Sequence, residues 1–374
     1  MINRDQLPKS KRLVVKIGSS MVTADGAGID RSHLAHWAEQ IARLKKKEID
    51  VLLVSSGAVS EGMSRLGWNS RPKALHHLQA AAAVGQMGVI QAYAHTFRSH
   101  KIDTAQILLT HDDLSNRKRY LNARSTINAL LTLGVLPIIN ENDSVATEEI
   151  QFGDNDTLAA LVANLAQADA LIILTDQAGL YERNPAEHSD AKLISYTQSN
   201  DPLLDKMVES SAGNLGTGGM KTKLKAARLA ARSGTTTIIA SGHEPDILNR
   251  LITGETIGTF LAPASEPLDA RKQWLAGQLQ PKGTVTLDDG AVAVIKSGGC
   301  SLLAVGVTSV AGKFIRGELV ECLNQQHQVI ARGLINYSAQ EAHRIKGKPS
   351  NQIEKELGYI DEDELIHRDN MVIH

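Results

Sequence analysis

Val51-Leu52-Leu53-Val54, followed at once by Ser55-Ser56-Gly57-Ala58, is the stretch that best indicates the fold. Four apolar residues without a polar interruption are typical of a strand covered on both faces, as in a parallel sheet. The small residues after them open a helical pattern. Five further apolar runs predict strands of the same kind: Leu13-Val14-Val15, Gln106-Ile107-Leu108-Leu109, Val135-Leu136-Pro137-Ile138-Ile139, Leu171-Ile172-Ile173-Leu174 and Thr237-Ile238-Ile239-Ala240.

Helical patterns alternate with these runs. Apolar residues recur at helical spacing after a candidate cap at Asp30 and again after Asp154 or Asp156; they are Leu34, Trp37, Ile41 and Leu44, and then Leu158, Leu161, Val162 and Leu165. This alternation predicts an α/β domain over residues 1–262, with an open, doubly wound, mostly parallel sheet sandwiched by helices. Ligands of such folds bind at the carboxyl ends of the strands.

The pattern changes after residue 262. Residues 263–280 read as a linker with a short helix near Asp269–Gly277, and residues 281–360 as a small β-rich, barrel-like domain. The order Val285/Leu287, Asp288-Asp289-Gly290, Val292/Val294 predicts a hairpin. Further strand candidates are Leu302–Val307, Leu319–Leu323 and Val329–Ile335. Residues 361–374, which begin Asp-Glu-Asp-Glu, are expected to be a solvated acidic tail.

Composition sets broad limits on function. The chain has 374 residues, 42% of them hydrophobic, and a formal net charge of −1, which gives no general attraction to nucleic acid or anionic membranes. Two cysteines, Cys300 and Cys322, provide no disulfide framework. The polar N-terminus and the absence of an 18-residue apolar run indicate a cytoplasmic protein without a membrane segment.

The stretch Gly213–Lys223 departs from the usual composition of a helix start. It is glycine-rich, and the helical pattern that follows carries Lys221 and Lys223 in its first turn, where the helix dipole disfavours each cation by roughly 0.3–1 kcal/mol. Glycines that permit close approach, free N–H groups and two cations together suit an anion such as phosphate. A flexible loop before a solvated basic helix explains the same residues equally well.

Small or polar clusters follow most of the predicted strands, where a ligand would meet the sheet. They are Lys16-Ile17-Gly18-Ser19-Ser20, Ser55-Ser56-Gly57, Asn140-Glu141-Asn142-Asp143, Phe152-Gly153-Asp154-Asn155-Asp156 and Thr175-Asp176. One Asp or Asn is explained as a helix cap, but not the whole set. The surplus suits a small substrate with ammonium and carboxylate groups, and the lysines suit phosphate. Because no Walker A, dinucleotide, zinc or serine-nucleophile motif occurs, phosphoryl transfer is the chemistry that fits.

These clusters, together with Gly216-Thr217-Gly218-Gly219-Met220, resemble the amino acid kinase family, and the C-terminal part resembles a PUA domain. The match extends over nearly the whole chain and is closest to members that phosphorylate L-glutamate. The resemblance implies ATP-dependent phosphorylation of the glutamate γ-carboxylate to glutamyl 5-phosphate, the first step of proline synthesis. It also implies Mg²⁺ as cofactor and feedback inhibition by proline. Implied partners are a dimeric or tetrameric assembly and functional coupling to glutamyl phosphate reductase.

The resemblance also implies roles for individual residues. Lys16 would contact the nucleotide phosphates, Lys223 would stabilise the transferring phosphoryl group, and Asp156 would organise both lysines. The substrate would be held by Ser56, Asp143 and Asn155, with Asp154 and Asn140 nearby. The nucleotide pocket would be lined by Lys16, Gly18, Ser19, Thr175, Asp176, Thr217, Gly218, Gly219, Met220, Lys221, Thr222 and Lys223. No protein ligand for the metal is assigned. Lys221 replaces the small polar residue expected there; it either faces solvent, the favoured interpretation, or adds a cation at the nucleotide mouth.

Two other functions are open to test. One is a related kinase acting on another carboxylate, a carbamate or a nucleoside monophosphate. The other is RNA binding through the PUA domain. After Pro281 ten Lys or Arg residues stand against twelve Asp or Glu residues, without a tryptophan. Because nucleic-acid modules carry a basic surface and often stacking aromatics, these counts argue against RNA as the principal partner.

Overall fold

The computed structural model describes residues 4–23, 28–146, 155–210, 219–263, 281–297, 300–360 and 362–373. The chain divides into two compact units. The first takes in Met1–Ser115 and Asn122–Pro267, and the second takes in Asn116–Leu121 and Leu268–His374. Within the described ranges, no helix has both the length and the apolar character needed to cross a bilayer.

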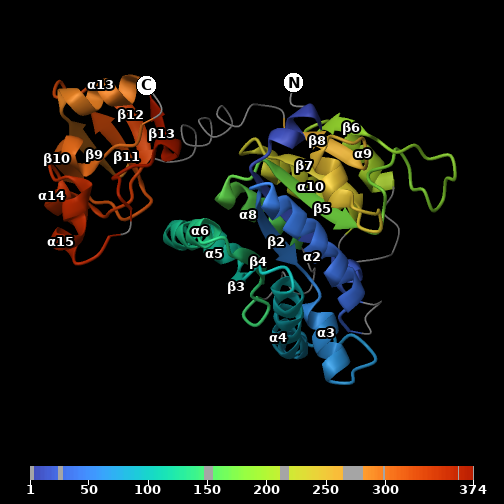
Figure 1. Cartoon of the computed structure of the whole chain (residues 1–374). Coiled ribbons are helices and arrows are strands. Elements are labelled where there is room, and N and C mark those ends of the chain that lie inside the picture. The colour runs from blue at the N-terminus through green and yellow to red at the C-terminus, as the bar shows by residue number, and fades with distance from the viewer. Residues whose placement is uncertain are drawn as a thin grey trace. The chain divides into compact units, whose positions relative to one another are not determined.

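The first unit is built on an eight-stranded sheet (Figure 1). Its strand order is β3-β4-β2-β1-β5-β7-β8-β6, and all pairings are parallel except that of β7 with β8. The chain adds strands on one side of β1 and then on the other, so the winding reverses beside β1. The strands are β1 (Arg12–Ile17), β2 (Asp50–Ser55), β3 (Thr104–Leu109), β4 (Leu136–Glu141), β5 (Ala170–Thr175), β6 (Tyr196–Gln198), β7 (Thr236–Ser241) and β8 (Thr259–Ala262).

Helices connect these strands. In chain order they are η1 (Arg4–Lys9), α1 (Ser19–Val22), α2 (Arg31–Lys46), α3 (Ala58–Arg65), α4 (Leu75–Arg98), α5 (His111–Ser115), α6 (Arg117–Thr132), α8 (Asn155–Ala166), α9 (Leu203–Ser210), α10 (Met220–Ala231) and α11 (Ile247–Ile252). The Asp30 side chain caps α2 as predicted, accepting hydrogen bonds from the backbone N–H groups of Ser32 and His33 at 2.9 and 3.1 Å. The doubly wound α/β sheet expected from the sequence is therefore confirmed.

All six strands predicted from apolar runs are present, within one or two residues at their ends. Two further strands, β6 and β8, lie at the far edge of the sheet. Neither was predicted. β6 has only three residues, and β8 has four and runs antiparallel to β7, so both are too short to show a periodic pattern in the sequence.

Helices cover both faces of the sheet. Apolar residues of α2, α4 and α11 join alternate strand residues in one core cluster, and α8 and α10 pack on the opposite face. In β1, Leu13, Val15 and Ile17 belong to that core cluster. Because successive side chains of a strand point to opposite faces, Lys16 projects toward α8 and α10.

Glycines allow α3 and α4 to lie side by side (Figure 1). A β-carbon at Gly62 would be 1.7 Å from the carbonyl oxygen of Ala81, and one at Gly85 would be 1.9 Å from that of Ala58. Any larger residue would force the helices apart. Since α3 begins directly after the end of β2, this close contact also fixes the position of the β2–α3 turn.

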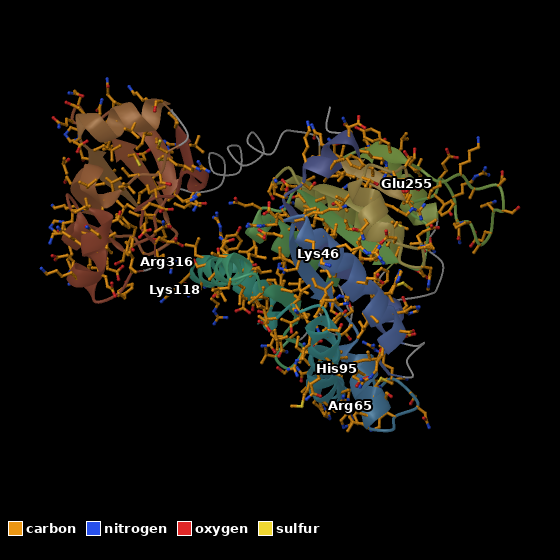
Figure 2. The ribbon with its side chains drawn as sticks, in the orientation of Figure 1. Lys46, Arg65, His95, Lys118, Glu255 and Arg316 are labelled. Atoms are coloured by element: carbon orange, nitrogen blue, oxygen red, sulfur yellow. The ribbon has the colours of Figure 1, made fainter. Side chains whose placement is uncertain are left out.

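Arg4 anchors the described N-terminal end to the edge of the sheet. Its guanidinium donates hydrogen bonds to the carbonyl oxygens of Glu255, Ile257, Ser195 and Gly258 at 2.8–3.3 Å. Glu255 is labelled in Figure 2, at the upper end of this unit. Burial lowers the pKa of Arg4 from its ordinary value, but the side chain remains a cation because a guanidinium is not deprotonated in proteins.

The second unit contains a five-stranded sheet in the order β10-β9-β11-β12-β13. β11 is parallel to β9, and the other pairs are antiparallel. The elements are β9 (Gly283–Leu287), α13 (Asp289–Ser297), η2 (Ala304–Gly306), β10 (Val307–Gly312), β11 (Leu319–Leu323), β12 (Val329–Leu334), α14 (Ala339–Ile345), η3 (Ser350–Gln352), α15 (Ile353–Leu357), η4 (Arg368–Asn370) and β13 (Met371–Ile373). The small β-rich domain is thus confirmed, with β11 and β12 where they were predicted.

The predicted hairpin at residues 285–294 is wrong. β9 ends at Leu287, and the following residues form helix α13. Asp288 begins this helix, because its side chain accepts a hydrogen bond from the N–H of Ala291 at 2.7 Å and its carbonyl accepts one from Val292. The Asp-Asp-Gly sequence therefore acts as a helix cap rather than a two-residue turn.

Two other expectations differ from the structure. Leu302–Val307 is not a strand, since Leu302 makes only an isolated bridge with Ile366 and β10 starts at Val307. The chain end is not a solvated tail, because β13 pairs with β12 and Ile366 is fully buried. The predicted linker helix near Asp269–Gly277 lies outside the described residues.

Candidate active site

A buried carboxylate joins two buried lysines at the centre of the first unit. Asp156, in the first turn of α8, lies 2.6 Å from Lys16 Nζ through Oδ1 and 3.2 Å from Lys223 Nζ through Oδ2. Lys16 comes from β1 and Lys223 from α10, and their exposed fractions are only 6% and 5%. The sequence expectation that Asp156 organises both lysines agrees with this geometry.

The two lysines hold Asp156 in its charged form. Burial by itself raises the pKa of Asp156, but the charges of Lys16 and Lys223, with hydrogen bonds from Lys16 and Thr222, lower it below its ordinary value. Asp156 is therefore ionised at neutral pH and pairs with both lysines. Lys16 stands at the carboxyl end of β1, where folds of this kind bind their ligands, so the two lysines are suited to an anionic ligand.

Asn155, the neighbour of Asp156, belongs to a second polar group. Its Nδ2 lies within 2.8–2.9 Å of the Ser55 carbonyl oxygen, Ser56 Oγ and Asn140 Oδ1. The strand register brings β1, β2 and β5 to the same edge, because Ile17 is opposite both Ser55 and Leu174. Asp156 and Asn155, which are adjacent in α8, thus contact two different sets of side chains. Asp156 contacts the two lysines, and Asn155 contacts Ser56 and Asn140.

Two supporting residues were missed by the sequence reasoning. Gln86 of α4 accepts a hydrogen bond from Asn140 Nδ2 at 2.7 Å, which fixes the Asn140 amide with its oxygen toward Asn155. Tyr93, also on α4, lies 3.0 Å from Ser55 Oγ. A single Gln or Tyr within a long helix gives no sequence signal for such a role.

Asp143 lies in the turn after β4. It lines a pocket of about 330 Å³ together with Gln86, which links the pocket to Asn140. Burial raises the pKa of Asp143 to about 6, although the charge of Arg71 acts in the opposite direction. Asp143 is consequently a carboxylate whose charge changes just below neutral pH.

The other predicted nucleotide residues lie at neighbouring strand ends. A side chain at Gly18 would lie 3.9 Å from Lys16 Nζ and 3.8 Å from the Leu174 carbonyl oxygen, so the backbone at Gly18 passes close to the cationic group. Ser19 is exposed at the start of α1. At the end of β5, Thr175 Oγ1 donates to Asp176 Oδ1 at 2.9 Å.

The two lysines in the first turn of α10 differ in exposure to solvent. Lys221 is exposed, as the favoured interpretation had it, whereas Lys223 is buried. Thr222 contacts Asp156, while Gly219 and Met220 begin the helix at the same end. The helical phase explains the difference, because Lys223 shares a buried face with Ala226, Ala227 and Ala230. Asp154, Thr217 and Gly218, also predicted to be site residues, lie outside the described residues.

Comparison with known proteins identifies the chain as a phosphotransferase. The chain belongs to the amino acid kinase family, which it matches over residues 11–241, and residues 283–357 match the PUA domain. Both resemblances inferred from the sequence motifs are therefore confirmed.

Curated relatives match along the entire chain. A Glutamate 5-kinase of Thioalkalivibrio sulfidiphilus is 60% identical over 370 residues, covering 99% of both chains. A Glutamate 5-kinase of Methylococcus capsulatus is 59% identical over 373 residues, covering 100% of both. Among solved structures, a UMP kinase from Bacillus anthracis has 16% identity and a TM-score of 0.47, covering 68% of this chain and 97% of its own, which is too weak to carry an argument.

Proposed function

We propose that this protein transfers the γ-phosphoryl group of ATP to the γ-carboxylate of L-glutamate, giving L-glutamyl 5-phosphate for proline biosynthesis. The observation that carries the proposal is the direct adjacency of two groups on α8. Asp156 holds a cationic pair suited to phosphate, and Asn155 holds an amide and hydroxyl cluster suited to a small polar substrate. The names of the full-length relatives support the choice of substrate.

Lys16 and Lys223, the phosphate-binding half of the proposed site, would lower the main electrostatic barrier to this reaction. A carboxylate is already ionised at pH 7, so its attack on phosphorus needs no general base. The difficulty is the approach of two anions, whose repulsion is about 4 kcal/mol for unit charges 4 Å apart at an effective dielectric of 20. We assign Lys16 to the nucleotide phosphates and Lys223 to the transferring phosphoryl group. Their positive charges would offset the repulsion.

The substrate half has groups for each part of an amino acid. Ser56, Asn155 and Asn140 offer a hydroxyl and amides, and Asp143 offers a carboxylate for the ammonium group. We propose the same substrate role for Asp154. Gly18, Ser19, Thr175, Asp176 and residues 217–222 are proposed to line the nucleotide pocket, with Lys221 at its solvent-exposed rim.

A divalent metal is implied by the use of ATP, and we propose Mg²⁺. In the described ranges, no group of three or more His, Cys, Asp or Glu side chains could hold a metal ion. Mg²⁺ commonly binds substrate phosphates and water with only one or two carboxylates, so a metal that enters with ATP fits these residues. It would neutralise phosphate charge, and the lysines would supply the remaining positive charge.

Further features of the proposal rest on the family resemblance alone. They are feedback inhibition by proline, assembly into dimers or tetramers, functional coupling to glutamyl phosphate reductase and a cytoplasmic location. We also propose that residues 1–262 form the catalytic domain and residues 281–360 the core of the PUA domain. A regulatory or structural role for this second domain is favoured over RNA binding.

The test is hydroxamate formation from ATP, L-glutamate and hydroxylamine, because only an acyl phosphate yields a hydroxamate. Lys223→Ala and Lys16→Ala should each lower turnover by about a hundredfold to a thousandfold or more, with the fold retained. Lys225→Ala is the matched control, since Lys225 is an exposed residue of the same helix. Normal turnover in either active-site variant would refute the assignment. Release of ADP with a carbamate or a nucleoside monophosphate, without ADP or hydroxamate from L-glutamate, would indicate another kinase of the family.

A further inference from the structure

A chain of three side-chain amides runs from Asn155 of α8 to the pocket that Asp143 lines. Asn155 Nδ2 lies 2.8 Å from Asn140 Oδ1, and Asn140 Nδ2 lies 2.7 Å from Gln86 Oε1. Gln86 in turn lines the pocket of about 330 Å³ together with Asp143. The three amides therefore connect the neighbour of Asp156 with that pocket.

The backbone carbonyl of Ser55 fixes the direction of this chain. A carbonyl oxygen can only accept, and that of Ser55 lies 2.9 Å from Asn155 Nδ2. The atom of Asn155 at this position must be its nitrogen, so Asn140 presents its oxygen to Asn155. Asn140 then donates through its nitrogen, and Gln86 accepts through Oε1. Every amide donates toward the pocket, and the last donor of the chain is Gln86 Nε2.

The amide nitrogen of Gln86 is available to a ligand. Within the described part of the chain, Gln86 makes no hydrogen bond other than the one that it accepts from Asn140. Its side chain is partly buried in the wall of the pocket. Hydrogen bonds aligned in one direction polarise one another, which strengthens the donor at the end of the chain. The pocket thus contains an oriented amide donor suited to an acceptor on the ligand.

The acidic residues of the pocket indicate which acceptor it takes. Asp143 and Glu141 both line it, and side chains of this kind disfavour a ligand that is only an anion. A zwitterion fits, because its ammonium group pairs with a carboxylate while its own carboxylate accepts from Gln86 Nε2. The α-carbon of an amino acid carries these two groups side by side. Because together they have no net charge, an uncharged donor suits the carboxylate.

We propose that Gln86 binds the α-carboxylate of L-glutamate and thereby selects an α-amino acid as the phosphoryl acceptor. The inference rests on the proposed kinase function and adds to it the residue that recognises the α-carboxylate. The γ-carboxylate would lie at the other end of the amide chain, where Asn155 adjoins Asp156 and its lysines. Gln86 thus has two contacts, one that orients Asn140 and one that binds substrate.

Substitutions of Gln86 separate these two contacts. Gln86→Met removes both, whereas Gln86→Glu keeps an oxygen that accepts from Asn140 and removes only the donor. We expect Gln86→Met to raise the KM for L-glutamate by about tenfold to a hundredfold, the range of a lost hydrogen bond to a charged group. In Gln86→Glu the KM for ATP should stay within about twofold. Gln91→Met, at an exposed glutamine of the same helix, is the matched control.

A substrate with an altered α-carboxylate tests which group Gln86 recognises. L-Isoglutamine keeps the ammonium group and the γ-carboxylate of L-glutamate but carries a carboxamide in place of the α-carboxylate. In Gln86→Glu the new carboxylate would repel the α-carboxylate and accept a hydrogen bond from the carboxamide. The ratio of kcat/KM for L-glutamate to that for L-isoglutamine should therefore fall by about a hundredfold or more. Hydroxamate formation measures both reactions, and if L-isoglutamine reacts too slowly, its inhibition constant against L-glutamate is compared instead.

Two results would overturn the role of Gln86. They are a KM for L-glutamate in Gln86→Met within twofold of wild type, or the same preference for L-glutamate over L-isoglutamine in Gln86→Glu as in wild type. Thermal unfolding of each variant verifies that the fold is kept, and Gln86→Leu replaces Gln86→Met if the latter fails to fold. Absence of hydroxamate from the wild-type protein with L-glutamate would instead refute the proposed function itself, so the two failures are distinguishable.

Discussion

Asp156→Asn is the most informative perturbation of the site. It keeps the size of a side chain that is 1% exposed but removes the negative charge between two buried lysines. At an effective dielectric of 20, the N–O distances of 2.6 and 3.2 Å correspond to attractions of about 6 and about 5 kcal/mol. Desolvation cancels much of this, and breaking a buried ion pair usually costs about 3–5 kcal/mol of unfolding free energy.

The loss of unfolding free energy should be measurable by urea unfolding at pH 7, and it should be smaller when a non-hydrolysable ATP analogue is present. The reason is that the triphosphate supplies the negative charge that the variant lacks. In wild type the pKa of Asp156 is lowered, so its stabilising contribution is present above the ordinary Asp pKa of about 3.9 and is lost as the pH falls through the folded-state value. The gap between variant and wild type should therefore narrow in acid.

Asp205→Asn is the matched control. It breaks a two-point ion pair with Arg228, in which the side chains of Arg228 and Asp205 are 35% and 55% exposed, and pairs so accessible to solvent contribute little. Equal stability of Asp156→Asn and wild type would contradict the idea that the charge of Asp156 stabilises the two buried lysines. A loss of unfolding free energy in Asp156→Asn that the ATP analogue leaves unchanged would show that the two lysines do not bind the phosphates.

Three further variants probe other parts of the structure. The KM for L-glutamate should rise as the pH falls below about 6, because Asp143 then becomes protonated and loses its attraction for the ammonium group. Asp143→Asn should abolish this pH dependence. A wild-type KM that is constant from pH 5 to 8 would exclude a role for Asp143 in binding the ammonium group. Arg4→Met should cost about 2–3 kcal/mol in chemical unfolding by leaving carbonyl oxygens unpaired, whereas unaltered stability would mean that water replaces the guanidinium. Gly85→Ala should destabilise the protein by about 1–3 kcal/mol, because its methyl group collides with the Ala58 carbonyl; a neutral effect on the melting temperature would show that α3 and α4 separate easily.

Much of the first unit was predictable because a buried parallel strand leaves a strong signal. Runs such as 51–54 and 171–174 have few structural alternatives in a chain of this composition. The strand ends then predicted which residues meet, since parallel strands present their carboxyl ends at one edge. In this way Lys16, Ser56 and Asn140, which are far apart in sequence, were expected in one site.

The remaining features depend on contacts that sequence patterns do not record. Asp288-Asp289-Gly290 suits a hairpin turn and a helix cap equally, and packing decides in favour of the helix. Gln86 has a role only because α4 passes beside Asn140. The distinction between Lys221 and Lys223 was present in the sequence, however, because the spacing to Ala226, Ala227 and Ala230 places only Lys223 on the apolar face.

The pairing of β13 with β12 bears on how this chain can be shortened. A terminus rich in acidic residues invites removal in protein engineering, yet cutting before residue 361 would strip the last strand from the sheet and expose the edge of β12. It would also remove Leu365 and Ile366 from the interior and uncover Leu319 and Leu334, against which Val372 packs. An unprotected edge beside apolar side chains promotes intermolecular strand pairing. Truncated versions are therefore expected to aggregate.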